Sequence, residues 1–145
     1  MIHIVKLCVG VATLEELESY RNERAHWWGA DYGEEVHVHR TRSMPKRKDE
    51  IEGIGSIYWV IGGMIRCRQR ILELREAVDS EGLACCDILM DRDLIRTVPR
   101  PKAPFQGWRY LKMEDAPPDM GASGFAEEEG GAPELAEELA KLGLL

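Results

Sequence analysis

Residues 37–75 read HVHRTRSMPKRKDEIEGIGSIYWVIGGMIRCRQRILELR, and this segment decides the fold because two strand-like runs meet there at a pair of glycines. The first run, Ser56–Ile61, is β-branched and aromatic, which favours a strand. Gly62 and Gly63 adopt positive φ without strain, so they allow a tight turn. A cationic loop, Arg40–Lys48, precedes the first run. The segment therefore predicts a β-hairpin with a positively charged lip.

The two strands of this hairpin have distinct faces. Trp59 shares one side of the first strand with Ile57 and Ile61, and one side is expected to be core. A helix is compatible with the composition of the returning run, Met64–Leu74. As a strand, that run presents a stripe that either binds a polyanion or is the solvated face of an edge strand. The stripe consists of Arg66, Arg68 and Arg70.

The rest of the chain supplies further strands and one main helix. Thr13 is a good helix N-cap and Glu16 completes a capping box, so we expect a helix from about Leu14 to Trp28. The prolines of Val98–Pro104 make that stretch extended and rigid. We expect an α+β fold, in which a small bent β-sheet or pseudo-barrel of five or six strands carries one main helix. Further strands are expected at 2–9, 35–42, 83–94 and 105–112.

The net charge of −7 conceals an uneven distribution. Residues 113–145 contain nine acidic side chains and one lysine, whereas residues 37–75 contain nine Lys or Arg side chains and four acidic ones. A near-neutral body thus has one basic region, which permits an anionic partner such as nucleic acid.

Hydropathy and cysteine usage bound the setting of the chain. No apolar run approaches the roughly 20 residues that span a bilayer, so no membrane association is expected. The N-terminus opens directly into a strand pattern without a signal peptide, and a cytoplasmic protein is expected. The cysteines form no C-x-x-C pair, and in a reducing cytosol we interpret them as small, mostly buried apolar residues. They are Cys8, Cys67, Cys85 and Cys86.

The histidines offer a weak metal motif. His37 and His39 share one face of a predicted strand, where H-x-H can bind metal. No third ligand with matching spacing is evident, so we expect a solvated polar face, and we predict no metal or cofactor. Phosphate-loop, nucleophile-elbow and H-E-x-x-H motifs are absent from the sequence. Whether the protein is an enzyme is left undecided, because no acid–base pair can be identified.

An aromatic pair, Trp27 and Trp28, closes the predicted helix. One interpretation is that the pair stacks on a nucleic-acid base. The alternative is that one ring is core and the other covers a loop, and we favour this second interpretation.

The C-terminal residues form a separate acidic segment. We expect a single domain over residues 1–116, followed over residues 117–145 by an acidic linker and a short C-terminal helix, at Pro133–Leu142. The tail either shields the basic lip or only aids solubility, and solubility is the safer interpretation.

Four segments together resemble a bacterial family called domain of unknown function 1489. They are IHIVKLCVG (2–10), RTRSMPKRKDEI (40–51), GSIYWVIGGMIRCRQRIL (55–72) and PFQGWRYLKMEDAPPDM (104–120). The resemblance spans about residues 2–120. The family name carries no activity, so it implies little about function.

A second resemblance is to the PUA-like superfamily, including its ASCH and EVE branches. Its layout is a basic, proline-bearing loop, a glycine, an apolar strand, a hairpin and a strand leading away. Arg42, Pro45, Gly55, Ser56–Ile61 and Ile65–Leu74 fit that layout in order. The resemblance implies a PUA-like pseudo-barrel and a domain that binds RNA or modified bases.

We therefore predict a domain that binds RNA or a modified-nucleotide-like ligand at the basic lip. Its cations would hold phosphate, while Trp59 or Trp108 would stack on a base. Two alternatives are a small enzyme acting on a nucleotide or nucleic acid, with a carboxylate or His beside the arginines, and a protein-interaction module. The predicted site residues are Arg42, Lys46, Arg47, Trp59, Arg66, Arg68, Arg70, Trp108 and Arg109.

Overall fold

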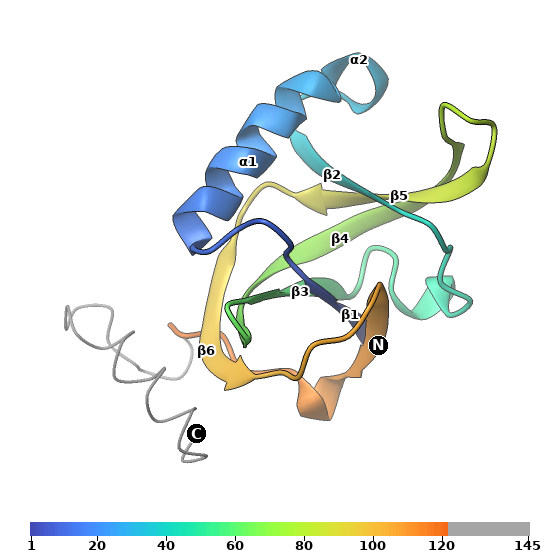
Figure 1. Cartoon of the computed structure of the whole chain (residues 1–145). Coiled ribbons are helices and arrows are strands. Elements are labelled where there is room, and N and C mark those ends of the chain that lie inside the picture. Colours follow the sequence, from blue (N-terminus) through green and yellow to red (C-terminus); the bar gives the residue numbers. More distant parts are fainter. Residues whose placement is uncertain (122–145) are drawn as a thin grey trace.

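A computed structural model describes residues 1–121 of the chain (Figure 1). Within them, seven strands form one mixed sheet in the order β2-β5-β4-β3-β1-β7, with β6 paired to β4. The α+β class is thus confirmed, with one main helix. The strands are β1 Ile2–Leu7, β2 Val36–Thr41, β3 Ser56–Ile61, β4 Met64–Val78, β5 Ala84–Asp91, β6 Ile95–Pro101 and β7 Trp108–Lys112. The helices are α1 Leu14–Trp27 and α2 Gly29–Tyr32, with 3-10 turns η1 Lys48–Glu50 and η2 Met113–Asp115.

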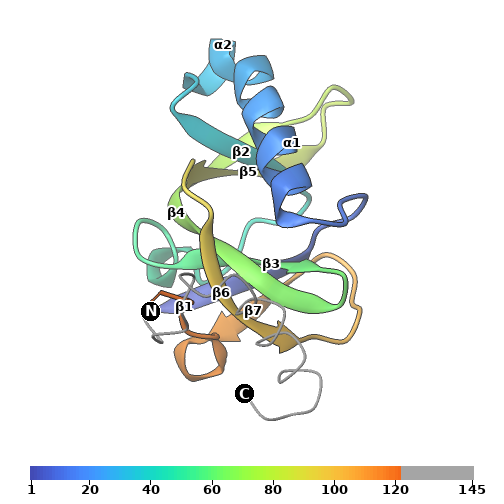
Figure 2. The ribbon, with the colours of Figure 1, turned by 90° about the vertical axis from the view of Figure 1, so that its left-hand side faces the viewer.

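The long strand β4 bends the sheet. Its first half pairs with β3 on one edge and with β6 on the other, whereas its second half pairs with β5. All three interstrand registers shift: with β3 between Trp59 and Val60, with β5 between Ile71 and Glu73, and with β6 between Ile65 and Cys67. Figure 2 shows β6 crossing beside β4 at the lower part of the sheet.

The strand β6 explains why seven strands are found where five or six were expected. The sequence suggests only a rigid proline stretch there, but Ile95–Pro101 pairs with β4. The other edge of β6 pairs with a later segment, because Val98 donates to the carbonyl of Pro118 and Met120 donates to that of Arg96. The chain is therefore still part of the sheet at Met120, and the expected tail helix lies outside the described residues.

The hairpin forms where the glycines predict it. Gly62 and Gly63 have φ values of 60° and 80° and connect β3 to β4. The face of β3 with Trp59 is core as expected, and the other face is buried as well, because every residue of Ser56–Ile61 is buried. β3 lies between β1 and β4, and its two faces contribute to two separate apolar clusters, one with Trp59 and one with Tyr58.

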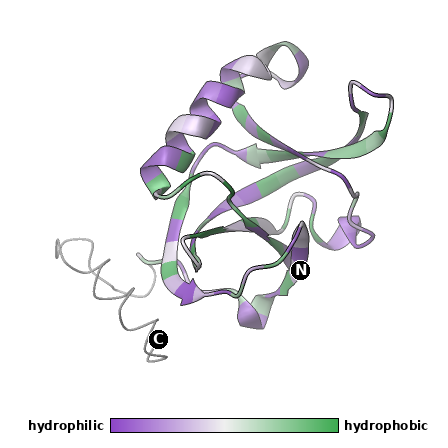
Figure 3. Ribbon diagram, in the orientation of Figure 1, coloured by the Kyte–Doolittle hydropathy of each residue, from purple (hydrophilic) through white to green (hydrophobic). Residues whose placement is uncertain are grey.

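The helix α1 begins as the sequence predicts. The Glu16 amide donates to Oγ1 of Thr13, the N-cap, at 3.1 Å. Figure 3 shows that α1 is largely hydrophilic, whereas the strands alternate hydrophobic and hydrophilic segments. Only three of its residues are buried, namely Leu17, Arg21 and Ala25. The helix therefore packs on the sheet, mainly beside β2, with an arginine in the centre of its inner face.

The buried inner face of α1 corrects the expectation for the two histidines of β2. His37 is fully buried and His39 is partly buried, so they do not form a solvated face. All four cysteines carry free thiols, and Cys67, Cys85 and Cys86 are buried as expected. Within residues 1–121, no helix has the length and apolarity that crossing a membrane requires. No group of three or more potential metal ligands occurs in the same residues.

Candidate functional site

The predicted lip does not converge on one hollow, because three of its arginines are each tied to a carboxylate. Arg47 donates to both oxygens of Glu50 at 2.6 and 2.8 Å. Arg68 donates to both oxygens of Asp119 at 2.8 and 2.9 Å. Arg42 pairs with a third carboxylate, and it lines a different cavity from Arg68.

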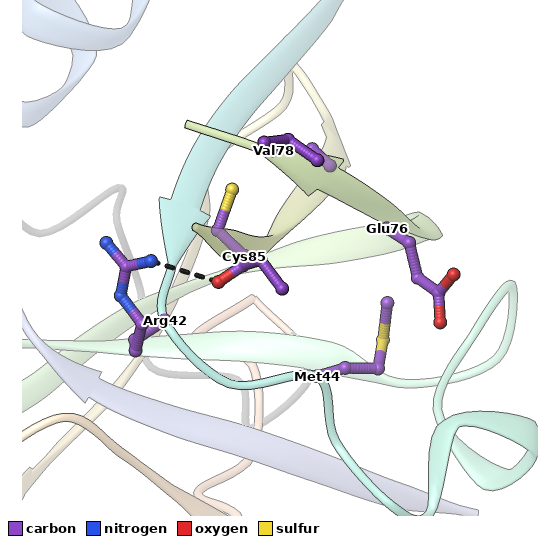
Figure 4. Close-up of a pocket in the computed structure, with 7 residues that line it drawn as sticks. Arg42, Met44, Glu76, Val78 and Cys85 are labelled. Carbon is purple, nitrogen blue, oxygen red and sulfur yellow. Dashed lines mark hydrogen bonds between the residues drawn. The ribbon is translucent and has the colours of Figure 1, made fainter. Parts of the chain in front are cut away.

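The Arg42 cavity has a volume of about 350 Å³ and lies against the β4–β5 hairpin. Figure 4 shows Arg42 hydrogen-bonded to the carbonyl oxygen of Ala84, at 2.9 Å. Its guanidinium also donates to Asp79 at 2.9 Å. Met44 and Val78 supply apolar walls. The Arg42 charge is therefore already balanced in this conformation.

The remaining lip residues are dispersed. Lys46, Arg70 and Arg109 are exposed, and Arg109 stacks against Phe105 with its guanidinium carbon 5.6 Å from the ring centroid. Arg66 donates to the carbonyl of Ile61, next to the hairpin turn.

One part of the lip is brought together by long-range contacts. The indole of Trp108 donates to the carbonyl of Ser43 at 3.3 Å, and the Arg47 amide donates to the hydroxyl of Tyr110. The aromatic rings of β7 therefore pack under the cationic loop. Since Trp108 is partly covered there, the loop and β7 form one surface rather than an open stacking platform.

The predicted stacking residue Trp59 is buried, with 1% of its surface exposed. Its indole N–H donates to Oε1 of Gln69 at 2.9 Å, and His39 packs edge-on against its ring. Trp59 is therefore not displayed at the surface, where a base could stack on its face. It instead forms the inner wall of a different cavity.

That cavity, which we call the Arg21 pocket, lies where β1 leads into α1, and has a volume of about 340 Å³. The loop after β1 and the outer end of Tyr20 surround it. Its polar lining comes from three elements, β1, α1 and β2. The side chains that line it include Lys6, Cys8, Tyr20, Arg21, His39 and Trp59.

Arg21 is the central group of this pocket, and it is only 4% exposed. Its Nη1 donates to the carbonyl of Val38 at 3.0 Å and its Nη2 contacts Nδ1 of His39 at 3.1 Å. The guanidinium carbon lies 4.8 Å from the ring centroid of Trp59. Its Nε is buried without a hydrogen-bond partner, and no carboxylate of residues 1–121 pairs with Arg21. Arg21 is thus a buried cation without a counter-charge.

The contact with Arg21 fixes the protonation of His39. A guanidinium only donates hydrogen bonds, so Nδ1 of His39 is the acceptor and the proton of the neutral ring is on Nε2. That Nε2 is buried and has no partner. Burial, together with the positive charges of Arg21 and Lys6, lowers the pKa of His39 to about 3. The ring is therefore neutral, with a second N–H that lacks an acceptor.

The electrostatics of the Arg21 pocket are those of a cationic site in apolar surroundings. Burial lowers the pKa of Lys6, and the charge of Arg21 adds to that effect. Burial also lowers the pKa of Arg21. Burial raises the pKa of the Cys8 thiol although both cations oppose the shift, so Cys8 remains a thiol. Burial therefore destabilises the charged forms of Lys6 and Arg21, and an anion that enters the pocket would offset that free-energy cost.

A satisfied polar network supports the wall of the pocket. Gln69 accepts from Trp59 and donates through Nε2 to Nδ1 of His37 at 2.8 Å and to the carbonyl of Asp91 at 2.9 Å. His37 in turn contacts Oδ1 of Asn22, on α1, at 3.1 Å. This network fixes α1 to the sheet at Asn22, the residue next to Arg21, so the guanidinium is held in position.

A second hollow, of about 480 Å³, surrounds Arg68. It contains His3 and Asp119, the groups that the enzyme alternative requires. Nδ1 of His3 accepts from the amide of Ser56, however, and both oxygens of Asp119 accept from Arg68. The lone pair of His3 Nδ1 is thus already used, and the hydrogen bonds from Arg68 lower the pKa of Asp119, which makes that carboxylate a weaker base.

The sequence contained a signal for Arg21 that was not used. Arg21 occupies the position on α1 where the helical repeat from Leu17 to Ala25 demands an inward side chain. A charged residue at such a position is almost never fully buried unless it is paired. This position in the helical repeat predicts that Arg21 is buried. Its contact with His39 depends on the tertiary fold and cannot be derived from the sequence.

Among protein families, the model of one described as protein of unknown function (DUF1489) matches residues 4–145. The chain belongs to this family, which confirms the first resemblance seen in the sequence. No curated protein and no solved structure matches the chain.

Proposed function

We propose that this member of the DUF1489 family binds RNA or a modified-nucleotide-like ligand, and that the Arg21 pocket holds an anionic group of that ligand. The observation that carries the proposal is the buried guanidinium of Arg21, which has no carboxylate partner within the described residues. Burying a cation without a counter-charge costs several kcal/mol in a protein interior. A ligand phosphate would supply the missing charge.

The hydrogen-bond donors of the pocket suit an oxyanion. The Nε–H of Arg21 and the Nε2–H of His39 both lack an acceptor, and Lys6 lines the same cavity. Hydrogen bonds between such donors and a phosphate oxygen are roughly twice as strong as neutral ones. A phosphate has more acceptor oxygens than a single carbonyl, so it suits a site with several donor groups better.

The size of the pocket sets an upper limit on what enters it. Its volume of about 340 Å³ is at the lower end of the range for small-molecule sites, roughly 300–1,000 Å³. A phosphate with its sugar, or a phosphate with one base, is therefore an appropriate occupant. A longer nucleic-acid strand must extend outside the pocket, where exposed cations such as Lys46, Arg70 and Arg109 would attract it.

The path of the chain supports a PUA-like pseudo-barrel as the architecture for this function. β4 pairs with β6, and the segment Pro118–Met120 pairs with the free edge of β6. The same chain leads back to β7, which pairs with β1. The strands thus follow a curved surface around one end of the molecule, and the domain includes residues up to Met120. The free thiols suit a reducing compartment such as the cytoplasm.

Isothermal titration calorimetry with the four nucleoside 5′-monophosphates and the matching nucleosides, at low salt, tests the proposal. At least one monophosphate should bind, its nucleoside should bind at least tenfold more weakly, and inorganic phosphate should compete. Arg21→Met should abolish the phosphate-dependent part, whereas Leu72→Ala, at an exposed position of β4, should leave it unchanged. The proposal fails if neither a monophosphate nor RNA binds, or if the phosphate makes no difference to affinity.

A further inference from the structure

A row of exposed aromatic and cationic side chains runs along the outer face of α1. Tyr20 is 41% exposed and Trp27 is 67% exposed, so both rings are displayed to solvent. Arg24 lies between them, with its guanidinium carbon 5.2 Å from each ring centroid. The spacing of four and then three residues places all three side chains on one face of the helix.

The row connects two hollows. Tyr20 lines the Arg21 pocket at one end. At the other end Trp27 lines another hollow, of about 600 Å³, together with Trp28 and Tyr32. We call it the Trp28 hollow. Figure 1 shows α1 running from the loop after β1 up to α2, and residues 20–27 form the half of the helix nearer to α2. A ligand in the Arg21 pocket therefore emerges beside Tyr20, at the start of the row.

Charge at the Trp28 hollow is already balanced. Arg40 lies 5.0 Å over the ring of Trp28 and donates to both oxygens of Asp87, and Arg75 pairs with Glu73. Asp31 also lines the hollow. This end of the row therefore contributes aromatic rings rather than charge. The positive charge of the row comes from Arg24 and from the Arg21 pocket.

Alternating rings and a guanidinium match the chemistry of single-stranded nucleic acid. Bases stack on exposed tryptophan and tyrosine, and arginine both stacks and binds phosphate. From residue 20 to residue 27 the helix rises about 10 Å, at ~1.5 Å per residue. That distance corresponds to roughly three nucleotides at the ~3.4 Å stacked rise of one strand.

We propose that single-stranded RNA lies along the row formed by Tyr20, Arg24 and Trp27, with one of its nucleotides anchored in the Arg21 pocket. This inference rests on the proposed function, because the pocket supplies the anchor. It reverses the interpretation that we favoured for the two tryptophans, in which both rings serve packing alone. Trp28 has a packing role, since it stacks with Arg40 and Tyr32, but Trp27 is displayed to solvent.

The test compares an eight-nucleotide single-stranded RNA with the tightest-binding nucleoside monophosphate, using fluorescence anisotropy and calorimetry respectively. Trp27→Ala should weaken the octanucleotide about 5- to 100-fold, the effect of losing one base–aromatic stack. The same variant should change the affinity for the monophosphate less than twofold. Met113→Ala removes an equally apolar, 52% exposed side chain from η2 and should change neither affinity.

A second variant keeps the test independent of any local change in the helix. Arg24→Gln preserves helix propensity and should reduce the salt dependence of octanucleotide binding by about one counterion, since one phosphate contact is lost. Equal losses for octanucleotide and monophosphate in Trp27→Ala, or no loss for either, would overturn the inference. If the wild-type protein binds the monophosphate but binds the octanucleotide no more tightly, the row fails while the pocket stands. If it binds neither, the proposed function itself has failed.

Discussion

Replacing Arg21 by methionine separates a binding role from a structural one. Methionine retains most of the apolar stem and places a polarisable sulfur beside the ring of Trp59. It removes the buried charge, the hydrogen bonds to Val38 and His39, and the unpartnered Nε–H. The two roles predict different effects on the free energy of unfolding.

The terms that enter this free energy largely cancel. The variant loses two hydrogen bonds from a charged donor, about 1.5–3 kcal/mol each. It also loses the contact of the guanidinium with the Trp59 ring, about 2 kcal/mol when desolvated. It gains relief from burying an unpaired cation, which is worth several kcal/mol. We therefore expect the free energy of unfolding to change by less than about 2 kcal/mol.

Anion binding should respond very differently. Truncating one partner of a buried, hydrogen-bonded charge pair costs about 2–5 kcal/mol of binding free energy. At about 1.4 kcal/mol per factor of ten, the affinity for a nucleoside monophosphate should fall at least about 30-fold. Urea unfolding followed by circular dichroism, and calorimetric titration of the same samples, measure the two quantities. A loss of stability above about 4 kcal/mol, or an affinity kept within threefold, would refute the reasoning.

Three further predictions concern the network, the histidines and the surface. Gln69→Leu should destabilise the fold by about 3–5 kcal/mol in urea unfolding, because the partners of its side-chain amide, including Trp59 and His37, are left buried and unpaired. The control Gln106→Leu, at an exposed position, should leave the free energy of unfolding unchanged. Burial lowers the pKa of His37 to about 4 and that of His39 to about 3. Below about pH 6.5 the unfolded chain therefore binds protons that the folded chain excludes. The free energy of unfolding should fall toward pH 4 with a limiting slope of about 2.7 kcal/mol per pH unit. A urea midpoint that stays constant between pH 7 and 4.5 contradicts this. Lys46→Gln should lower the salt dependence of RNA binding by about one counterion, and an unchanged slope excludes Lys46 from the contact surface.

Local chemistry explains which parts of the fold were predictable. The cap at Thr13 and the turn at Gly62 and Gly63 depend on neighbouring residues alone, and the structure has them where the sequence predicts. The strand β6 was not predicted, because its pairing with β4 depends on a partner about 30 residues away. Pro99 and Pro101 also lie within β6, and prolines, which cannot donate to a ladder, count against a strand in the sequence.

The candidate site was less predictable, because a charge is meaningful only with its partners. Arg42 and Arg68 looked free in the sequence, but their carboxylates, Asp79 and Asp119, come from segments 37 and 51 residues later. Arg21 had acidic neighbours along the chain, but the helix turns them outward. Counting cations along a sequence therefore does not separate paired from unpaired charges, and the proposed anion site depends on that difference.

Arg40 provides the matched comparison for Arg21, since both arginines stack on a tryptophan and both contact β-sheet residues. Arg40 donates to both oxygens of Asp87, a carboxylate that is fully buried and also accepts from the hydroxyl of Tyr32 at 2.6 Å. Burial raises the pKa of Asp87, but the hydrogen bonds from Arg40 and Tyr32 outweigh it, so the pKa is below its usual value.

Arg40→Met therefore leaves a buried anion behind, whereas Arg21→Met leaves none. We expect Arg40→Met to lose about 3 kcal/mol or more in urea unfolding at pH 7, and to keep its affinity for the monophosphate. Without Arg40 the pKa of Asp87 should rise, so part of the loss should disappear as the pH falls and the carboxyl group takes up a proton. If the two variants instead lose similar amounts of stability, the absence of a counter-charge at Arg21 has no energetic meaning, and the anion proposal loses its basis.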